Sequence, residues 1–192
     1  QASLFMVLLA AFQILLYRYS GQKDIVVGSP IANRHYQETE GLIGFFINTL
    51  ALRTTFAGNE SFIEVLNNVK ETTLQAYQHQ DVPFEQLVDH LNITRELNRN
   101  PVFQVMFILQ NANDKNYLTF QNLHIEPLQT NYPISRFDLS FDIDEQPDHI
   151  GISIEYSTDL FFSETIERFA AAFATMLQDI LQNPLQSLHD LT

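Results

Sequence analysis

A short segment with ionisable side chains, His79-Gln80-Asp81 followed by Glu85, has the residue types for acid–base or metal chemistry. His79 and Asp81 could form a base and the carboxylate that orients it, and with Glu85 they could bind a metal ion. No serine, cysteine or second histidine stands at a spacing that would supply a nucleophile or a further ligand. We therefore favour a structural interpretation, in which Asp81 caps a helix starting at Pro83 and His79 bonds the carbonyls that close the preceding helix.

Two arginines, Arg95 and Arg99, lie just before Asn100-Pro101. Guanidinium groups suit phosphate or carboxylate binding, because their donors match two acceptor oxygens at once. The chain has 23 acidic residues and only 10 lysines and arginines, however. We therefore favour internal ion pairs, or hydrogen bonds to loop carbonyls, as the role of these arginines.

The segment that begins at Gly44, includes Phe46 and continues past Thr49 is mostly apolar. The polar side chain of Asn48 interrupts it. A buried amide that lacks hydrogen-bond partners costs about 1–3 kcal/mol. Asn48 therefore either satisfies neighbouring backbone or faces a substrate, and the sequence leaves both alternatives open. Gly44 would allow backbone or substrate to approach closely, since it has no Cβ.

A further hydroxyl, Ser29, ends a β-branched run that starts at Asp24 and is followed by Pro30. This pattern predicts a strand and then a Ser-Pro turn. The residues alone justify nothing beyond the turn.

Four of these segments, taken together and in this order, resemble signature motifs of the condensation domains of nonribosomal peptide synthetases. They are Val27-Gly28-Ser29-Pro30-Ile31-Ala32-Asn33-Arg34, Ile43-Gly44-Phe45-Phe46-Ile47-Asn48-Thr49, His79-Gln80-Asp81-Val82-Pro83-Phe84-Glu85 and Arg95-Glu96-Leu97-Asn98-Arg99-Asn100-Pro101-Val102-Phe103. The His-His-x-x-x-Asp-Gly motif that carries the chemistry in that family is absent, and no two histidines are adjacent. The resemblance therefore implies that residues 1–192 are the C-terminal lobe of a condensation domain, without the catalytic lobe.

The resemblance also implies roles for individual residues, none of them catalytic. The strand of Asn48 would border the substrate channel, Ser29 could hydrogen-bond the acceptor substrate, and Arg34 would hold the loop beneath the channel. The channel candidates are Ser29, Asn33, Gly44, Phe46, Asn48 and Thr49. The structural members of the motifs are Arg34, His79, Asp81, Pro83, Phe84, Glu85, Arg95, Arg99, Asn100 and Pro101.

The function implied by the resemblance is amide-bond formation between a donor acyl or peptidyl thioester and an acceptor aminoacyl thioester. Both substrates would be attached to the phosphopantetheine of carrier proteins, and the chain itself would bind no metal or cofactor directly. The implied partners are the N-terminal lobe, peptidyl and aminoacyl carrier proteins, and an adjacent adenylation domain. We expect the isolated lobe to be inactive and to self-associate through exposed apolar surface. The alternatives are a non-catalytic docking module and another acyltransferase of the same fold.

Hydrophobic periodicity predicts the elements that must position these residues. The expected helices run from Ser3 to Gly21, from Ser61 to about Gln80, from Pro83 to about Leu91, and from a cap at Ser163 to Asn183. The expected strands are Asp24 to Ser29, Phe45 to Arg53, Val102 to Gln110, Tyr117 to Pro127 and a hairpin from Phe137 to Tyr156. We predict an α/β fold, a mixed sheet of about six strands packed with helices. The resemblance implies a chloramphenicol-acetyltransferase-like lobe.

Composition limits the partners and the cellular compartments that suit the chain. A net charge of −13 disfavours nucleic acid and anionic membranes as partners, and the absence of cysteine excludes disulfides and thiolate catalysis. The apolar stretch from Leu4 to Leu16 is interrupted by Gln13 and followed by Arg18 too early to span a bilayer, so we expect a buried helix. We expect a cytoplasmic protein, and, since the chain starts at Gln1, one that begins partway through a larger polypeptide.

Overall fold

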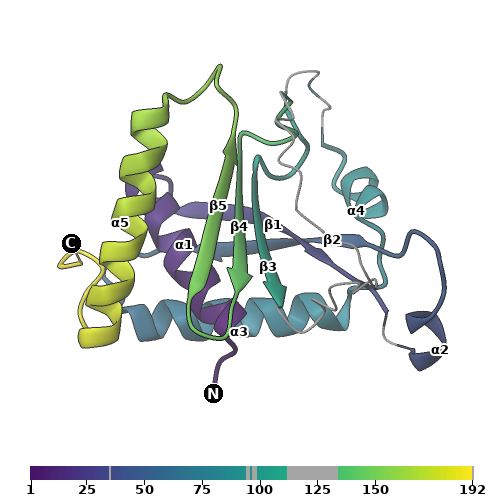
Figure 1. The fold of residues 1–192 in the computed structure, drawn as a ribbon, viewed down its shortest axis with the longest axis horizontal. Coiled ribbons are helices and arrows are strands. Elements are labelled where there is room, and N and C mark those ends of the chain that lie inside the picture. Colours follow the sequence, from purple (N-terminus) through teal and green to yellow (C-terminus); the bar gives the residue numbers. More distant parts are fainter. Residues whose placement is uncertain (35, 94–95, 97–98, 112–133, 192) are drawn as a thin grey trace, which may run out of the picture.

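The computed structural model describes residues 1–34, 36–93, 96, 99–111 and 134–191 (Figure 1). The helices are α1 (Leu4–Ser20), α2 (Gln37–Glu40), α3 (Phe62–Gln78), α4 (Phe84–His90) and α5 (Ser163–Gln182). The strands are β1 (Asp24–Ile31), β2 (Asn48–Thr55), β3 (Val105–Asn111), β4 (Leu139–Glu145) and β5 (Ile150–Tyr156). The strand expected at Tyr117 to Pro127 lies outside the described residues.

The described strands form one sheet in the order β2-β1-β3-β4-β5. The outer pairs β1–β2 and β4–β5 are antiparallel, whereas β3 runs parallel to both β1 and β4. A single bridge, Gly28 to Met106, joins β1 to β3, and in Figure 1 β1 and β2 cross the other three strands at a steep angle. The predicted mixed α/β sheet is confirmed, with five described strands where about six were expected, and β3 lies at its centre.

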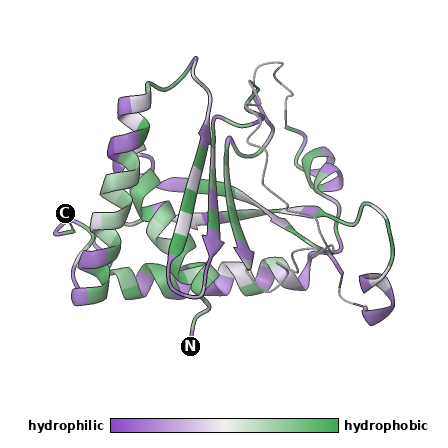
Figure 2. Cartoon of the chain, in the orientation of Figure 1, coloured by the Kyte–Doolittle hydropathy of each residue, from purple (hydrophilic) through white to green (hydrophobic). Residues whose placement is uncertain are grey.

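The helix α1 is buried between the sheet, α3 and α5, as its apolar sequence predicts (Figures 1 and 2). Its ends follow local signals, because the Ser3 hydroxyl accepts a hydrogen bond from Met6 N and Gly21 closes the helix with φ 67°. Gln13, the polar interruption, is fully buried and bonds β2, where its Nε2 donates to the Leu52 carbonyl at 3.0 Å. None of the described helices combines the length and apolarity needed to cross a bilayer.

A cluster of phenylalanines fills the core between α1, the sheet and α5. The ring of Phe12 lies 4.7 Å from that of Phe141, which in turn lies 4.9 Å from Phe173. Phe107 of β3 contacts both Phe12 and Phe141, and all four side chains are fully buried. Burial of each such side chain contributes about 1.5–3 kcal/mol, so this cluster is a large part of the stability of the fold.

The bounds of β1 and β2 differ from those predicted. Ser29 and Pro30 do not form a turn, since β1 continues to Ile31 and Pro30 pairs with Thr49. Proline is tolerated there because β1 is bridged to β3 only at Gly28, so no further ladder bond is lost on that side. The predicted start of β2 at Phe45 is wrong, because the ladder ends where β1 ends.

The start of β3 was also predicted too early. Val102 has φ 70°, a left-handed conformation that a strand cannot contain, and Phe103 N donates to the Pro101 carbonyl across it at 2.8 Å. This γ-turn is strained for a β-branched residue and delays the strand to Val105.

The C-terminal hairpin pairs as the alternating pattern predicts, with Leu139, Phe141 and Ile143 buried. The same alternation predicts one buried face for the hairpin, but Ile150 and Ile152 are exposed because β5 is the edge strand. Helix α5 starts at Ser163 itself with Phe162 as the preceding residue, so Ser163 is not its cap. Most of the apolar stripe predicted for α5 is buried, although Ala170 and Leu177 are only partly covered and Leu181 is exposed. The buried members are Ile166, Phe169, Phe173, Met176 and Ile180.

Candidate functional site

Three of the four motif segments meet at the ring of Phe103. A Cβ placed on Gly28 would lie 2.2 Å from Phe103 Cε2, so only glycine leaves room for this ring against β1. The same ring packs against Phe84 at 5.3 Å and against Phe137 at 5.9 Å between ring centroids. The γ-turn at Val102 directs Phe103 into this position, and the ring is almost completely buried.

The remaining segment joins the same assembly through Asn48. Its Nδ2 donates to the carbonyls of Gln80 and Val82, both at 2.8 Å. Its Oδ1 accepts from Phe84 N at 3.1 Å and from Thr49 N at 2.9 Å. Asn48 is 9% exposed, and these four bonds use both donors and both lone pairs of its amide. The geometry therefore favours the first of the two alternatives, in which Asn48 satisfies neighbouring backbone.

The helix caps around this segment differ from those predicted. Helix α4 begins at Phe84 after Pro83, so Asp81 is not its cap, and the amide oxygen of Asn48 accepts the first helical N–H instead. Asn48, which lies on β2, thus caps α4 in place of the Asp81 carboxylate. His79 ends α3 through its main-chain N–H, which donates to the Ala76 carbonyl at 3.1 Å.

The acidic residue Glu85 lies in the first turn of α4, where a negative charge favours the helix dipole. Among the described residues, no three histidine, aspartate or glutamate side chains are grouped so that they could hold a metal ion.

The connection between β1 and β2 is held by Arg34 and Phe46. The guanidinium carbon of Arg34 lies 4.1 Å from the centre of the Phe46 ring, and its Nη1 donates to the carbonyl of Thr39. Gly44 lies under the same ring, since a Cβ there would be 2.9 Å from Phe46 Cε2. Asn33 adopts the left-handed conformation, with φ 52°, which turns the chain out of β1.

The loop before β3 is tied to the start of β4. Asn100 Nδ2 donates to the Arg136 carbonyl at 2.8 Å, and Gln104 Nε2 donates to the Asn100 carbonyl at 2.9 Å. Arg99 reaches the Gln104 amide oxygen at 3.5 Å, so this contact is with an amide rather than an acid. Pro101 accepts the γ-turn bond through its carbonyl, and Arg95 lies outside the described residues.

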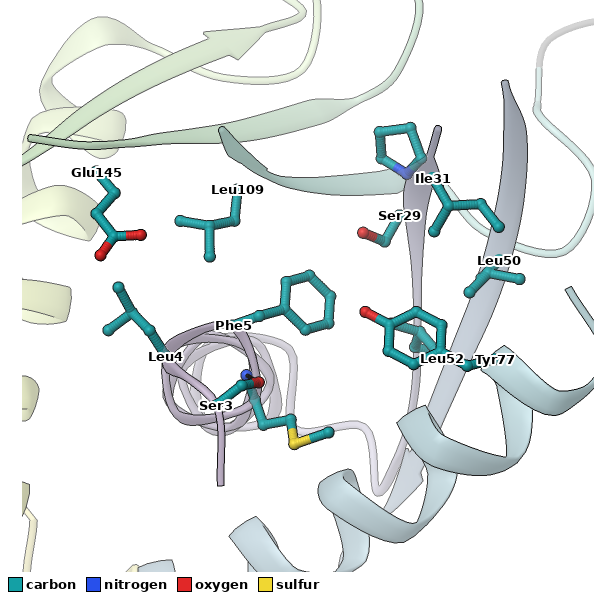
Figure 3. Close-up of a pocket in the computed structure, with 12 residues that line it drawn as sticks. Ser3, Leu4, Phe5, Ser29, Ile31, Leu50, Leu52, Tyr77, Leu109 and Glu145 are labelled. Carbon is teal, nitrogen blue, oxygen red and sulfur yellow. Dashed lines mark hydrogen bonds between the residues drawn. The ribbon is translucent and has the colours of Figure 1, made fainter. Parts of the chain in front are cut away.

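A pocket of about 510 Å³ opens beside the end of β1 (Figure 3). It is lined by Ser3, Leu4, Phe5, Met6, Ser29, Pro30, Ile31, Leu50, Leu52, Tyr77, Leu109 and Glu145. Of the six channel candidates, Ser29 lines this pocket and the other five lie elsewhere. Ser29 shares a face of β1 with the buried residues Ile25 and Val27, so its hydroxyl points to the core side of the sheet where the helices leave space.

Sequence reasoning missed Tyr77 as a site residue. Its position on α3 predicted a core side chain, but its hydroxyl points into the pocket from the same side as that of Ser29 (Figure 3). Burial raises the pKa of the Tyr77 hydroxyl, which therefore remains protonated and able to donate at neutral pH. The available signal was a tyrosine at the end of an otherwise apolar helix stripe, because its hydroxyl needs a partner when the side chain is buried.

The pocket can accommodate a ligand that is mostly apolar and carries few polar groups. Its volume lies within the usual range of ligand sites, about 300–1,000 Å³. Among the described residues that line it, Glu145 is the charged one, and none is a lysine or an arginine. A phosphate group would therefore find no cationic partner on the part of the lining that the structure describes.

Comparison with known proteins gives consistent matches. The family model for the Condensation domain matches residues 1–192. One component of the linear gramicidin synthase of Brevibacillus parabrevis is 50% identical over 189 residues, 97% of this chain and 2% of that protein. Gramicidin S synthase 2 of Aneurinibacillus migulanus is 45% identical over 182 residues, 95% of this chain and 4% of that protein. The chain thus spans a few per cent of the length of these curated relatives.

Among solved structures, the X-domain from teicoplanin biosynthesis, in its complex with OxyB, matches with a TM-score of 0.88 and 27% identity. That match covers 100% of this chain and 42% of the X-domain chain.

Proposed function

Since this chain belongs to the condensation-domain family, we propose that it forms one wall of the chamber in which a nonribosomal peptide synthetase makes an amide bond. The acceptor amine of one carrier-bound aminoacyl thioester attacks the donor carbonyl of another carrier-bound thioester, and the donor thiol leaves. The observation that carries this proposal is the convergence of the motif segments around β1, which leaves the Ser29 hydroxyl facing a pocket.

The chain's own residues would act by shape and orientation. Phe103 packs between Gly28 and Phe84 and so fixes the position of β1. The position of β1 in turn sets the direction in which the Ser29 side chain points. Asn48 ties α4 and the end of α3 to β2 beside it. Gly28 and Phe103 are buried and the bonds of Asn48 are partly buried, and such packing and hydrogen bonding suit a wall that positions a substrate. The imidazole that positions or deprotonates the amine would come from the N-terminal lobe, because this sequence has no adjacent histidines.

An exposed apolar segment, residues 36–47, supports the proposed partnership with that lobe. Five large apolar side chains of this segment are exposed, and the Phe45 side chain is 90% exposed. They are Tyr36, Leu42, Ile43, Phe45 and Ile47. Contiguous apolar side chains of this kind mark a surface that packs against another protein surface. Carrier proteins and an adjacent adenylation domain complete the proposed set of partners.

The test is reconstitution of the condensation reaction from two lobes. The chain is mixed with an N-terminal lobe that contains the double-histidine motif, together with a donor-loaded and an acceptor-loaded carrier protein. We expect the amide product by mass spectrometry from the pair of lobes and none from either lobe alone. Turnover by the isolated chain would refute the assignment of the base to the other lobe. Absence of product from a stable pair would refute the function.

A second candidate function is a docking module without chemistry. The observation that favours it is the match to the teicoplanin X-domain, which is in a complex with OxyB. The net charge of −13 implies that docking of an acidic carrier protein would depend mainly on apolar contacts. Titration of a fluorescently labelled carrier protein separates the candidates, since a docking module binds it in the absence of the N-terminal lobe.

A further inference from the structure

The pocket beside β1 has two chemically distinct ends. The hydroxyls of Ser29 and Tyr77 point into it from one side, and the carboxylate of Glu145 lies on the opposite side beyond Leu109 (Figure 3). The ring of Phe5 extends between them and supplies an apolar surface. A ligand that fills this space therefore needs an apolar body with a polar group at each end.

The two hydroxyls are available to a ligand. Ser29 is 3% exposed, and within the described residues neither its hydroxyl nor that of Tyr77 bonds another protein group, so both reach the space of the pocket. A ligand that fills the pocket removes both hydroxyls from solvent, so a ligand group that bonds them gains affinity. An analogue without that group leaves the hydroxyls unpaired and binds more weakly.

The charge of the lining selects the other end of the ligand. Glu145 is the charged side chain among the described lining residues and is half-buried, so it attracts a protonated amine and repels carboxylates and phosphates. Of the two substrates in the proposed function, the acceptor is the one whose α-amine is the nucleophile and must therefore lie free inside the chamber.

We propose that Tyr77 is a specificity-determining residue of this pocket, which takes an amine-bearing acceptor whose apolar side chain ends in a hydrogen-bonding group. The amine lies toward Glu145, the apolar body packs on Phe5 and Leu109, and the tip of the side chain bonds Tyr77 and Ser29. This inference rests on the proposed function for the identity of the acceptor. The recognition itself is a property of this chain.

The test is a pair of probes that differ by one hydroxyl, tyrosinamide and phenylalaninamide. Each is titrated into the ¹⁵N-labelled chain, and binding is followed through the amide signals of residues around the pocket. We expect tyrosinamide to bind about 10-fold more tightly than phenylalaninamide, because only its phenol reaches the two hydroxyls. N-acetyltyrosinamide, which lacks the cationic amine, should bind several-fold more weakly than tyrosinamide.

Tyr77→Phe removes the hydroxyl and keeps the ring, and it should reduce the preference for tyrosinamide to about 1–3-fold. Ser29→Ala should reduce the preference in the same direction, and it serves as a second test if Tyr77→Phe fails to fold. Tyr19→Phe, the same substitution at an exposed tyrosine away from the pocket, is the matched control and should keep the preference.

Equal affinity of the unmodified chain for both probes, no binding of either, or an unchanged preference in Tyr77→Phe would overturn the inference. These results are independent of the condensation assay. If the chain prefers tyrosinamide but the two lobes form no product, the proposed function is refuted and the role of Tyr77 in the pocket stands. If the lobes form product but the chain shows no preference, the role of Tyr77 is refuted and the proposed function stands.

Discussion

Replacement of Asn48 by alanine removes hydrogen bonds that hold α4 and the end of α3 to β2. The amide bonds the carbonyls of Gln80 and Val82 and the N–H of Phe84, residues more than thirty positions away in the chain. Each such bond contributes about 0.5–1.5 kcal/mol net, so Asn48→Ala should lower the free energy of unfolding by roughly 2–4 kcal/mol. At about 2–4 °C per kcal/mol for a chain of this size, Tm should fall by about 5–15 °C.

The measurement is urea denaturation followed by circular dichroism, together with differential scanning calorimetry. Asn48→Asp keeps an oxygen for the N–H of Phe84 but has no donors for the two carbonyls, so it should also be destabilising. Asn67→Ala, an exposed asparagine on α3, is the matched control and should change stability by less than about 0.5 kcal/mol.

A channel residue would behave in the opposite way. If Asn48 oriented substrate, its removal would leave the free energy of unfolding near that of the unmodified chain and would lower turnover in the reconstituted two-lobe assay. An unchanged Tm together with lost turnover would therefore refute the structural role that the four hydrogen bonds indicate.

Three further predictions concern other parts of the chain. Gly28→Ala should lower the free energy of unfolding by about 1–3 kcal/mol, because the new methyl group overlaps the confined ring of Phe103; denaturation with no change in midpoint would contradict this packing. Partial burial opposes the ionisation of Glu60, but main-chain N–H groups of the preceding turn donate to its carboxylate, so its pKa lies below the ordinary glutamate value. The ionised Glu60 carboxylate should stabilise the fold fully above the pKa that Glu60 has in the unfolded chain, and this stabilisation should disappear as pH falls through its lower pKa in the folded chain. Glu60→Gln should therefore reduce the loss of stability that is measured as pH falls in the acid range. The double substitution Ile43→Ser and Phe45→Ser should leave stability within about 0.5 kcal/mol and reduce self-association in sedimentation velocity at micromolar concentration; a monomeric unmodified chain would contradict the exposed contact surface.

Local signals predicted much of the secondary structure, because they act over three or four residues. The predicted start of α3 at Ser61 is confirmed by a reciprocal capping box of Ser61 and Glu64, in which Ser61 N donates to the Glu64 carboxylate at 2.8 Å. Gly21 ends α1 at the predicted position, in the left-handed conformation that glycine readily adopts. The alternation around Phe141 placed the right residues of β4 in the core.

Signals between distant segments were not visible in the sequence. The Asp81 carboxylate was the expected cap of α4, yet Asn48 from another strand provides the acceptor. The left-handed conformation of Val102 runs against the preference of a β-branched residue, and the packing of Phe103 against Gly28 accompanies it. No local pattern reports such a contact, because its partners are separated by more than seventy residues.

The sequence alone determined the family resemblance, the α/β class and the absence of the catalytic histidine pair, since these depend on residue identity and short-range order. The tertiary structure decided that Asn48 is fully occupied by backbone, that Ser29 faces a pocket, and that Tyr77 joins it there. Those outcomes depend on where strands end and on how helices cross them, and burial of side chains from remote segments determines both.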